Sequence, residues 1–298
     1  MFRNSMKQDR VVSHVSRLAV ILEASLAVVA LVIGLQGAVH AQTNPHLDTD
    51  ASTALPDAPS PATGFTPASS DAGDVTIASF PRNFLHDQAA IWTSPARLRV
   101  HNLEWLVPLS AAVGISLATG RYTMTQVVSH DPGFNNANVN TSNVLIGGWI
   151  VAPVAICSYG HFHQDDHARE AGILSAESMI DGVVVEEALK QVFRRERPYI
   201  DNANGRFFQS NVGVDSSFPS SHSLIAWSAA SALAGEYHSP WIQAGLYSAA
   251  TSVSLTRVLG REHFPSDVLV GSALGWLIGH EVVKRHHPLK SLVAHREP

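Results

Sequence analysis

Six apolar stretches, separated by short polar connectors, occupy the C-terminal two thirds of the chain. They are rich in Ala, Leu, Ser and Val, contain few Gly or Pro breaks, and mostly exceed strand length, so they predict helices. Nothing between them alternates as a β-hairpin does. The stretches lie at residues 105–117, 144–157, 171–193, 223–236, 241–256 and 267–283. We therefore expect an all-α fold built as a six-helix bundle.

The N-terminal segment has the order of a secretory signal peptide. Four basic residues precede residue 18, an apolar run extends from Leu18 to Leu35, and small residues precede Gln42. This basic, apolar and small-residue order is typical of export signals. The apolar run is also long enough to remain in a membrane. Residues 1–41 are therefore predicted to be a signal peptide or an N-terminal anchor.

The remaining boundaries follow from composition. Residues 42–78 are rich in Pro, Ala, Ser, Thr and Asp, and they have too few large apolar side chains to offset chain entropy, so a disordered linker is expected. Residues 80–100 regain aromatic and aliphatic side chains and predict a short amphipathic lead-in. The helical bundle is assigned to 79–290 and a tail to 291–298.

Composition narrows the function. With 45% hydrophobic and 15% charged residues, the chain suits a weakly apolar membrane bundle or a helical protein with a large core. The net charge of −5 gives no reason to expect a nucleic-acid partner. The single cysteine, Cys157, excludes an internal disulfide and a cysteine-based zinc site. We interpret the polar run from His161 to His167 as a solvated loop rather than a metal cluster.

Three polar clusters lie where the apolar stretches begin or end. The first extends from Lys190 to Pro198, the second from Phe218 to His222, and the third from Thr256 to Asp267. If consecutive helices are antiparallel, the end of the third helix, the start of the fourth, the end of the fifth and the start of the sixth share one end of the bundle. The clusters are therefore predicted to form one site.

The first cluster supplies cations. Lys190 and Arg197 are seven residues apart, so on a continuous helix both project from one face. Arg194 falls on the same face of the helix, whereas the side chains of Arg195 and Glu196 are expected to project from other faces. Pro198 is expected to mark where the helix stops.

The second and third clusters place histidines beside helix starts. Pro219, Ser220 and Ser221 are start signals for the fourth helix, whose free N–H groups form an anion site with His222 at its rim. In the third cluster, Arg257 closes the fifth helix and Pro265 opens the sixth. His263 then lies in the turn, and Asp267, four residues on, can accept its imidazole N–H and leave the other nitrogen as a nucleophile.

The order of these clusters resembles the type 2 phosphatidic acid phosphatase superfamily, which includes lipid phosphatases, bacterial acid phosphatases and vanadium haloperoxidases. The family pattern is a lysine, six residues and Arg-Pro, then Pro-Ser-Gly-His, then Ser-Arg, five residues, His, three residues and Asp. Lys190 to Pro198 matches fully, and Arg257, His263 and Asp267 match in spacing, with Thr256 in place of serine. The resemblance spans roughly residues 100–285. It implies the helical bundle of the acid phosphatase and vanadium haloperoxidase type.

The resemblance also implies a role for each matching residue. His263 would attack phosphorus to form a phosphohistidine, Asp267 would orient it, and His222 would protonate the leaving oxygen. The phosphate oxygens would be bound by Lys190, Arg197, Ser220, Ser221 and Arg257. The sequence departs from the family at Ser221, where the family has glycine. Serine keeps the backbone N–H, but its Cβ can crowd the phosphate.

The expected function is hydrolysis of a phosphomonoester or pyrophosphate, with a lipid phosphate, an isoprenyl pyrophosphate or a small phosphoester as substrate. No cofactor or metal is expected, since phosphoryl transfer mainly needs positioning and charge neutralisation. Two alternatives remain: a vanadium-dependent haloperoxidase holding vanadate in the same pocket, and a weakened envelope protein that binds phosphorylated ligands without turnover.

The location is predicted to be the outward or periplasmic side of a bacterial cell envelope. Most apolar runs are 13–17 residues long, shorter than the roughly 20 needed to span a bilayer. The third stretch also carries four acidic residues that are costly in lipid. These features favour a soluble or peripheral bundle, whereas the basic residues after the sixth helix would suit an integral protein with a cytoplasmic end.

Overall fold

A computed structural model describes residues 75–209, 211–212 and 215–286. Across these residues the fold is all-α, with seven α-helices, short 3₁₀ or π turns and no strand, as the apolar pattern predicts. The predicted signal peptide or anchor (1–41), nearly all of the predicted linker (42–78) and the tail (291–298) lie outside the described residues.

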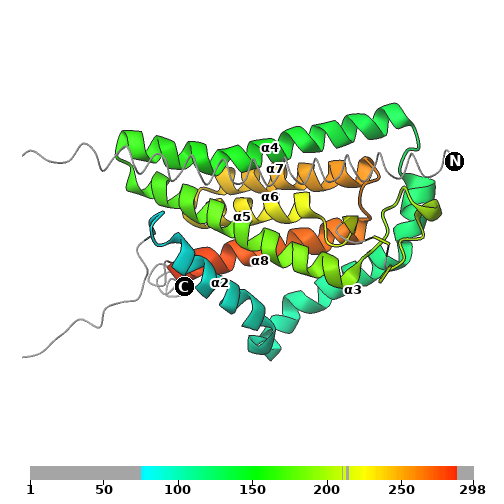
Figure 1. Ribbon diagram of the computed structural model, residues 1–298, viewed down its shortest axis with the longest axis horizontal. Helices are drawn as coiled ribbons and strands as arrows, with labels where there is room; N and C mark the ends of the chain where they lie inside the picture. The colour runs from blue at the N-terminus through cyan, green and yellow to red at the C-terminus, as the bar shows by residue number, and fades with distance from the viewer. Residues whose placement is uncertain (1–74, 210, 213–214, 287–298) are drawn as a thin grey trace, which may run out of the picture. The chain divides into compact units, whose positions relative to one another are not determined.

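Each of the six predicted apolar stretches lies within a longer helix (Figure 1). The amphipathic lead-in forms the first described helix, and the six apolar stretches form the other six. The bounds are α2 Phe80–Thr93, α3 Leu103–Tyr122, α4 Pro132–His163, α5 Asp166–Phe193, α6 Ser221–Glu236, α7 Pro240–Leu259 and α8 Pro265–His286. The helices exceed the apolar runs because polar residues extend their ends, and side-chain caps are formed at α4 by Asp131 and at α5 by Asp165.

The connector between α4 and α5 is much shorter than predicted. The segment from His161 to His167 is exposed, as expected, but the predicted loop is wrong, because α4 continues through His163 and α5 starts at Asp166. Gln164 adopts a left-handed conformation with φ of 56°, which ends α4. Asp165 then caps α5 by accepting the Ala168 N–H at 3.0 Å. Two residues therefore reverse the chain.

Helix α6 lies inside the bundle and contacts α5, α7 and α8 (Figure 1). Its buried residues are mostly Ala and Ser, which allow neighbouring helices to approach closely. On α8, Gly271, Gly275 and Gly279 face the α6 backbone one turn apart. A Cβ added at Gly271 would lie 2.7 Å from the Ser220 carbonyl oxygen, so a side chain there cannot be accommodated. The two helices therefore pack backbone against backbone.

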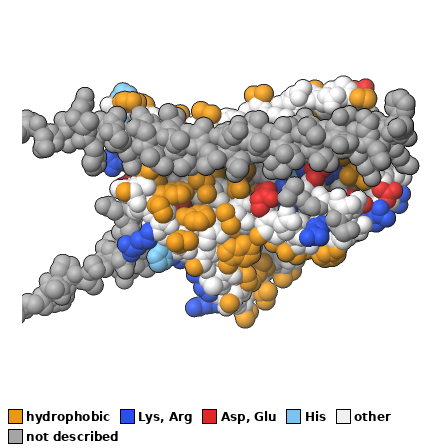
Figure 2. All heavy atoms as spheres, in the orientation of Figure 1, with side chains coloured by type: hydrophobic (Ala, Val, Ile, Leu, Met, Phe, Trp, Pro, Cys, Tyr) orange, Lys and Arg blue, Asp and Glu red, His pale blue; other side chains and the backbone are white. Residues whose placement is uncertain are grey.

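Apolar side chains on α2, α3 and α4 are left exposed. Figure 2 shows hydrophobic side chains gathered in the lower part of the view, where Figure 1 draws α2 and α3. On α3 and the segment before it, the exposed ones include Leu98, Val100, Leu103, Val107 and Ile115. Among the described residues, Val100–Val127 and Pro132–His163 are long and apolar enough to cross a membrane by length and composition. Both are longer than the predicted apolar runs.

Candidate functional site

The three polar clusters meet at one end of the bundle, as the antiparallel arrangement predicts. The Ser217 N–H donates to the Arg195 carbonyl oxygen at 2.9 Å, which joins the first cluster to the segment before α6. The Ser220 N–H donates to the Asp267 carbonyl oxygen at 3.1 Å, which joins the starts of α6 and α8. Backbone hydrogen bonds therefore fix the relative positions of the clusters.

The geometry of the first cluster differs from the prediction. Helix α5 ends at Phe193, because Arg194 takes a left-handed conformation with φ of 39° and donates its N–H to the Lys190 carbonyl oxygen. Lys190 and Arg197 therefore do not share one helix face. Arg197 instead approaches the site from the loop after α5. Pro198 lies five residues beyond the helix end.

Lys190 forms a buried group with Glu186 and Ser221. Its ammonium pairs with the Glu186 carboxylate one turn earlier and donates to the Ser221 hydroxyl at 2.7 Å. The Ser221 hydroxyl donates in turn to Glu186 Oε1 at 2.6 Å. The side chain that replaces the family glycine is thus engaged with α5. Ser221 begins α6, where the first N–H groups have no intrahelical acceptor.

Ser220 is the capping residue of α6, and its side chain is fully buried. Its hydroxyl accepts a hydrogen bond from the Ser223 hydroxyl at 3.2 Å and makes no cap bond to the helix. The Ser220 N–H donates to the Asp267 carbonyl oxygen, so only the Ser220 hydroxyl remains for the predicted phosphate contact. Its position fixes the start of α6 against α8.

Arg197 and Arg257 share the carboxylate of Glu262. Arg197 Nη1 lies 3.0 Å from Glu262 Oε2, and Arg257 Nη2 lies 3.4 Å from the same atom. Arg197 also donates through Nε to Asp215 Oδ1 at 3.1 Å. The Nε of Arg257 is buried and has no hydrogen-bond partner among the described residues. Both guanidiniums are therefore held in place, and one retains an unused donor.

His263 is held by the backbone rather than by Asp267. Its Nδ1 lies 2.7 Å from the Ser217 carbonyl oxygen and 3.9 Å from Asp267 Oδ2. A carbonyl oxygen can only accept, so Nδ1 carries the proton and Nε2 has the free lone pair. The expected direct hydrogen bond from His263 to Asp267 is thus absent, although the tautomer is the one predicted.

Asp267 instead binds Arg195. Arg195 Nη1 lies 2.5 Å from Asp267 Oδ1, and the other carboxylate oxygen accepts the Phe264 N–H at 2.8 Å. The guanidinium stacks against Phe264, 4.1 Å from the ring centre, and also donates to the Ser266 hydroxyl. From the sequence alone, Arg195 is expected to point away from the site, because the helix face that carries Lys190 is extended through Arg197. This expectation is wrong, since α5 ends at Phe193. The position of Arg195 beside the cations of the first cluster is its one signal in the sequence.

Helix α4 contributes two contacts that the sequence analysis missed. His222 Nε2 lies 3.2 Å from Asn143 Oδ1, and Arg257 Nη1 donates to the Ser142 hydroxyl at 3.1 Å. Ser142 and Asn143 immediately precede an apolar stretch, so composition alone assigns them to a connector. The helix extends 12 residues before that stretch and brings both side chains to the site.

Three cations act on both histidines. Burial holds the pKa of His222 and of His263 well below the usual 6.5, and the charges of the three cations, Lys190, Arg197 and Arg257, lower it further. Burial raises the pKa of Asp267 to about 6, although Arg195 opposes that shift. Both imidazoles are therefore neutral at pH 7 when no anion occupies the site.

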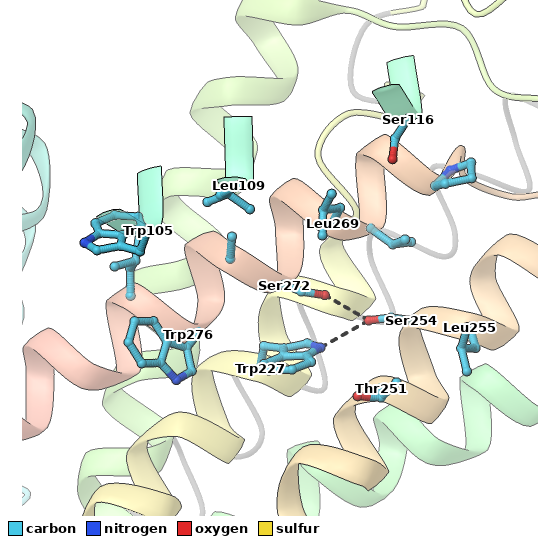
Figure 3. Close-up of a pocket in the computed structure, with 14 residues that line it drawn as sticks. Trp105, Leu109, Ser116, Trp227, Thr251, Ser254, Leu255, Leu269, Ser272 and Trp276 are labelled. Atoms are coloured by element: carbon cyan, nitrogen blue, oxygen red, sulfur yellow. Dashed lines mark hydrogen bonds between the residues drawn. The ribbon is translucent and has the colours of Figure 1, made fainter. Parts of the chain in front are cut away.

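An apolar cavity of about 620 Å³ adjoins the start of α8 (Figure 3). Trp105 and Leu109 of α3 face Trp276 of α8 across it. At its inner side Ser254 accepts a hydrogen bond from Trp227 Nε1 at 3.2 Å. Pro265 and Val268, which also line it, lie within five residues of His263. The cavity therefore adjoins the first turns of α8, the helix that begins two residues after His263.

Comparisons with known proteins bear on the same segment. Residues 171–290 match the family model described as the PAP2 superfamily. A lipid A 1-phosphatase of Porphyromonas gingivalis is 37% identical over 65 residues, which cover 21% of this chain and 15% of that protein. A crystal structure of a transmembrane PAP2 type phosphatidylglycerolphosphate phosphatase from Bacillus subtilis is 21% identical. The match covers 74% of this chain and 96% of the Bacillus subtilis chain, with a TM-score of 0.42.

The matched segment contains all three clusters. It starts in α5 before Lys190 and ends beyond Asp267, so the motifs stand in the order that the family requires. The similarity of this chain to the PAP2 superfamily is therefore carried by residues 171–290, which match the family model.

Proposed function

We propose that this protein is a phosphatase that cleaves a phosphomonoester or pyrophosphate through a phosphohistidine on His263. The observation that carries the proposal is the fixed Nε2 lone pair of His263 inside a group of three cations. A neutral imidazole is a nucleophile, and cations around it neutralise the phosphoryl oxygens. Both requirements are met by residues that the fold brings together.

In the first step, His263 Nε2 attacks phosphorus and the bond from phosphorus to the leaving oxygen breaks. Lys190 and Arg197 contact the phosphoryl oxygens, and the unused Nε of Arg257 donates to one of them. His222, positioned by Asn143, gives a proton to the leaving oxygen. The Ser221 N–H at the start of α6 adds a further donor.

In the second step, water attacks phosphorus and the bond from phosphorus to Nε2 breaks. His222, which lost its proton in the first step, accepts one from that water. Inorganic phosphate leaves and His263 regains its free lone pair. These steps draw only on side chains and backbone groups of the chain.

The substrate class is proposed to be a phosphate carried on an apolar chain. The cavity beside Pro265 is lined mostly by apolar side chains and can hold a hydrocarbon segment next to the reacting phosphate. The exposed apolar residues of α2 and α3 suit contact with lipid. The similar protein of Porphyromonas gingivalis is named a lipid A 1-phosphatase, which supports a lipid phosphate as substrate.

We further propose association with the bacterial envelope, with the site facing outward. Val100–Val127 and Pro132–His163 have the length and hydropathy of membrane-crossing helices. Protease protection of the full chain in spheroplasts tests this: cleavage by external protease near the site is expected. Full protection of the site in intact spheroplasts would overturn the orientation.

The activity is tested by phosphate release from three substrates: a long-chain lipid phosphate, an isoprenyl pyrophosphate and a short soluble phosphomonoester. We expect higher kcat/KM for the two apolar substrates. Rapid quenching with ³²P-labelled substrate should trap an acid-labile phosphoenzyme in the wild type and none in His263→Ala. His222→Ala should lose about 10²–10⁴-fold in kcat.

The matched control is His101→Ala, since His101 is exposed in a 3₁₀ turn and belongs to none of the three clusters. It should keep wild-type turnover. Phosphate release by His263→Ala at the wild-type rate would reject the phosphohistidine, and absence of release from every substrate would reject the phosphatase assignment. Vanadate-dependent halide oxidation without phosphate release would instead favour the haloperoxidase.

A further inference from the structure

A second group of ionisable side chains lies at the other end of α5 and α8. Asp87 of α2, Glu177 of α5 and His286 at the end of α8 are exposed by 1%, 0% and 8%. Glu177 precedes Lys190 by 13 residues, a distance of about 20 Å along a helix. This group is therefore separate from the candidate phosphatase site.

The donor atoms of these three residues converge. One ligand atom from each lies within 4.8 Å of the others. His286 Nε2 is 3.2 Å from Asp87 Oδ2 and 3.8 Å from Glu177 Oε2. Tetrahedral zinc with ligands at about 2.0–2.2 Å holds its donor atoms about 3.3–3.6 Å apart. The spacing thus suits one metal ion.

Glu177 supplies a second, independent observation. Neither of its carboxylate oxygens has a hydrogen-bond partner among the described residues, although the side chain is completely buried. A buried carboxylate without partners is strongly unfavourable. Protonation of Glu177 would remove the charge, but it would leave a buried O–H donor without an acceptor. The carboxyl group would therefore still lack hydrogen-bond partners.

The charged side chains around Glu177 also favour a bound cation. Asp181, one turn after Glu177, is also fully buried; its Oδ1 accepts from Gln88 at 2.8 Å and its Oδ2 has no partner among the described residues. Asp87 is paired with Arg285 at 2.8 Å. Three carboxylates thus lie near one another, and Arg285 is ion-paired with one of them, Asp87. A divalent cation would offset the remaining negative charge.

We propose that Asp87, Glu177 and His286 bind one divalent transition-metal ion, with zinc the best match to one imidazole nitrogen and two carboxylate oxygens. Magnesium and calcium prefer sites made only of oxygen donors. Because the ligands come from α2, α5 and α8, the ion fastens α2 to the bundle. The inference does not depend on the phosphatase assignment.

The test uses full-chain protein without a polyhistidine tag, purified in chelator-free buffer. Mass-spectrometric metal analysis should find about one zinc per chain. Dialysis against EDTA should lower Tm by about 5–10 °C, and ZnCl₂ should restore it whereas MgCl₂ should not. Glu177→Gln and His286→Ala should each retain less than a tenth of the wild-type zinc.

Asp166→Asn is the matched control, because Asp166 is an exposed carboxylate on the same helix. It should keep its zinc and its response to EDTA. Circular dichroism of each variant shows whether it is folded before its metal content is compared. Wild-type protein that holds no zinc and has an EDTA-insensitive Tm would overturn the proposal. Equal zinc binding by folded Glu177→Gln would overturn it as well.

Discussion

His263 and Ser217 are joined by a hydrogen bond of 2.7 Å between Nδ1 of the imidazole and the backbone carbonyl oxygen. The carboxylate four residues on is 3.9 Å away and holds Arg195 instead. The backbone therefore sets the tautomer, and the carboxylate fixes the segment that carries the histidine. Asp267 and Arg195 act on His263 through the position of the turn.

Asp267→Asn and Arg195→Met should each lower the free energy of unfolding by about 3–5 kcal/mol, because each leaves a buried partner without its counter-charge. Chemical denaturation measures this loss. Asp267→Asn should keep more activity than His263→Ala, since Ser217 still holds the imidazole. Arg169→Gln, which breaks an exposed ion pair with Asp166, should cost at most about 1 kcal/mol. Equal losses in all three variants would contradict the role of the buried pair.

The pH dependence of kcat/KM should have its maximum below pH 6.5. His222 must carry a proton to act as an acid, and its lowered pKa means that the protonated form of the free enzyme is lost as pH rises toward neutrality. Bound phosphate adds negative charge and raises the pKa of His222. The basic limb of kcat should therefore lie at higher pH than that of kcat/KM. A basic limb of kcat/KM above pH 7 would contradict the proposed acid.

Replacement of Ser221 tests the departure from the family pattern. Its hydroxyl links Lys190 to Glu186, so Ser221→Ala and Ser221→Gly should both weaken kcat/KM by about tenfold, the value of one hydrogen bond to a charged group. Both substitutions leave the backbone N–H in place. Steady-state kinetics of the two variants give the answer. If Ser221→Gly exceeds the wild type while Ser221→Ala does not, the serine Cβ obstructs the phosphate.

Gly275→Ala should destabilise the bundle by about 1–3 kcal/mol. The added methyl would meet the Leu224 carbonyl oxygen of α6, and the two helices would have to separate. Thermal unfolding measures the loss. Gly245→Ala on α7 is the matched control, because a Cβ there meets nothing within 4 Å, and it should stabilise by up to about 1 kcal/mol. Similar shifts in both variants would mean that intrinsic helix propensity dominates.

Much of the architecture was predictable because the periodicity of apolar residues and the residues that start or stop helices are local signals. Pro265 starts α8, and Arg257 lies in the last turn of α7, as expected. The antiparallel arrangement of consecutive helices then brings the clusters together. Helix ends were less predictable: the left-handed residues Arg194 and Gln164 stop α5 and α4 without glycine or proline at those positions.

The contacts that sequence reasoning missed depend on tertiary structure. Glu262 bridges Arg197 and Arg257, and Asn143 reaches His222 from a helix far away in the chain. No local pattern distinguishes these side chains from solvated polar residues. Arg195 was missed for a different reason, since the helix face used to place it ends two residues earlier. The roles given to the site residues stay predictions until the kinetics are measured.

The glycine stripe on α8 has a consequence for how substrate choice could diverge. Because Gly271, Gly275 and Gly279 bring α8 against the α6 backbone, a larger residue on that interface would shift His263 relative to Ser221. Substitutions in the surfaces through which α6 and α8 touch should therefore be poorly tolerated. Helix α3 lines the far side of the apolar cavity and bears none of the proposed catalytic groups. New leaving groups would therefore be accommodated by changes in α3, with the reaction centre left unaltered.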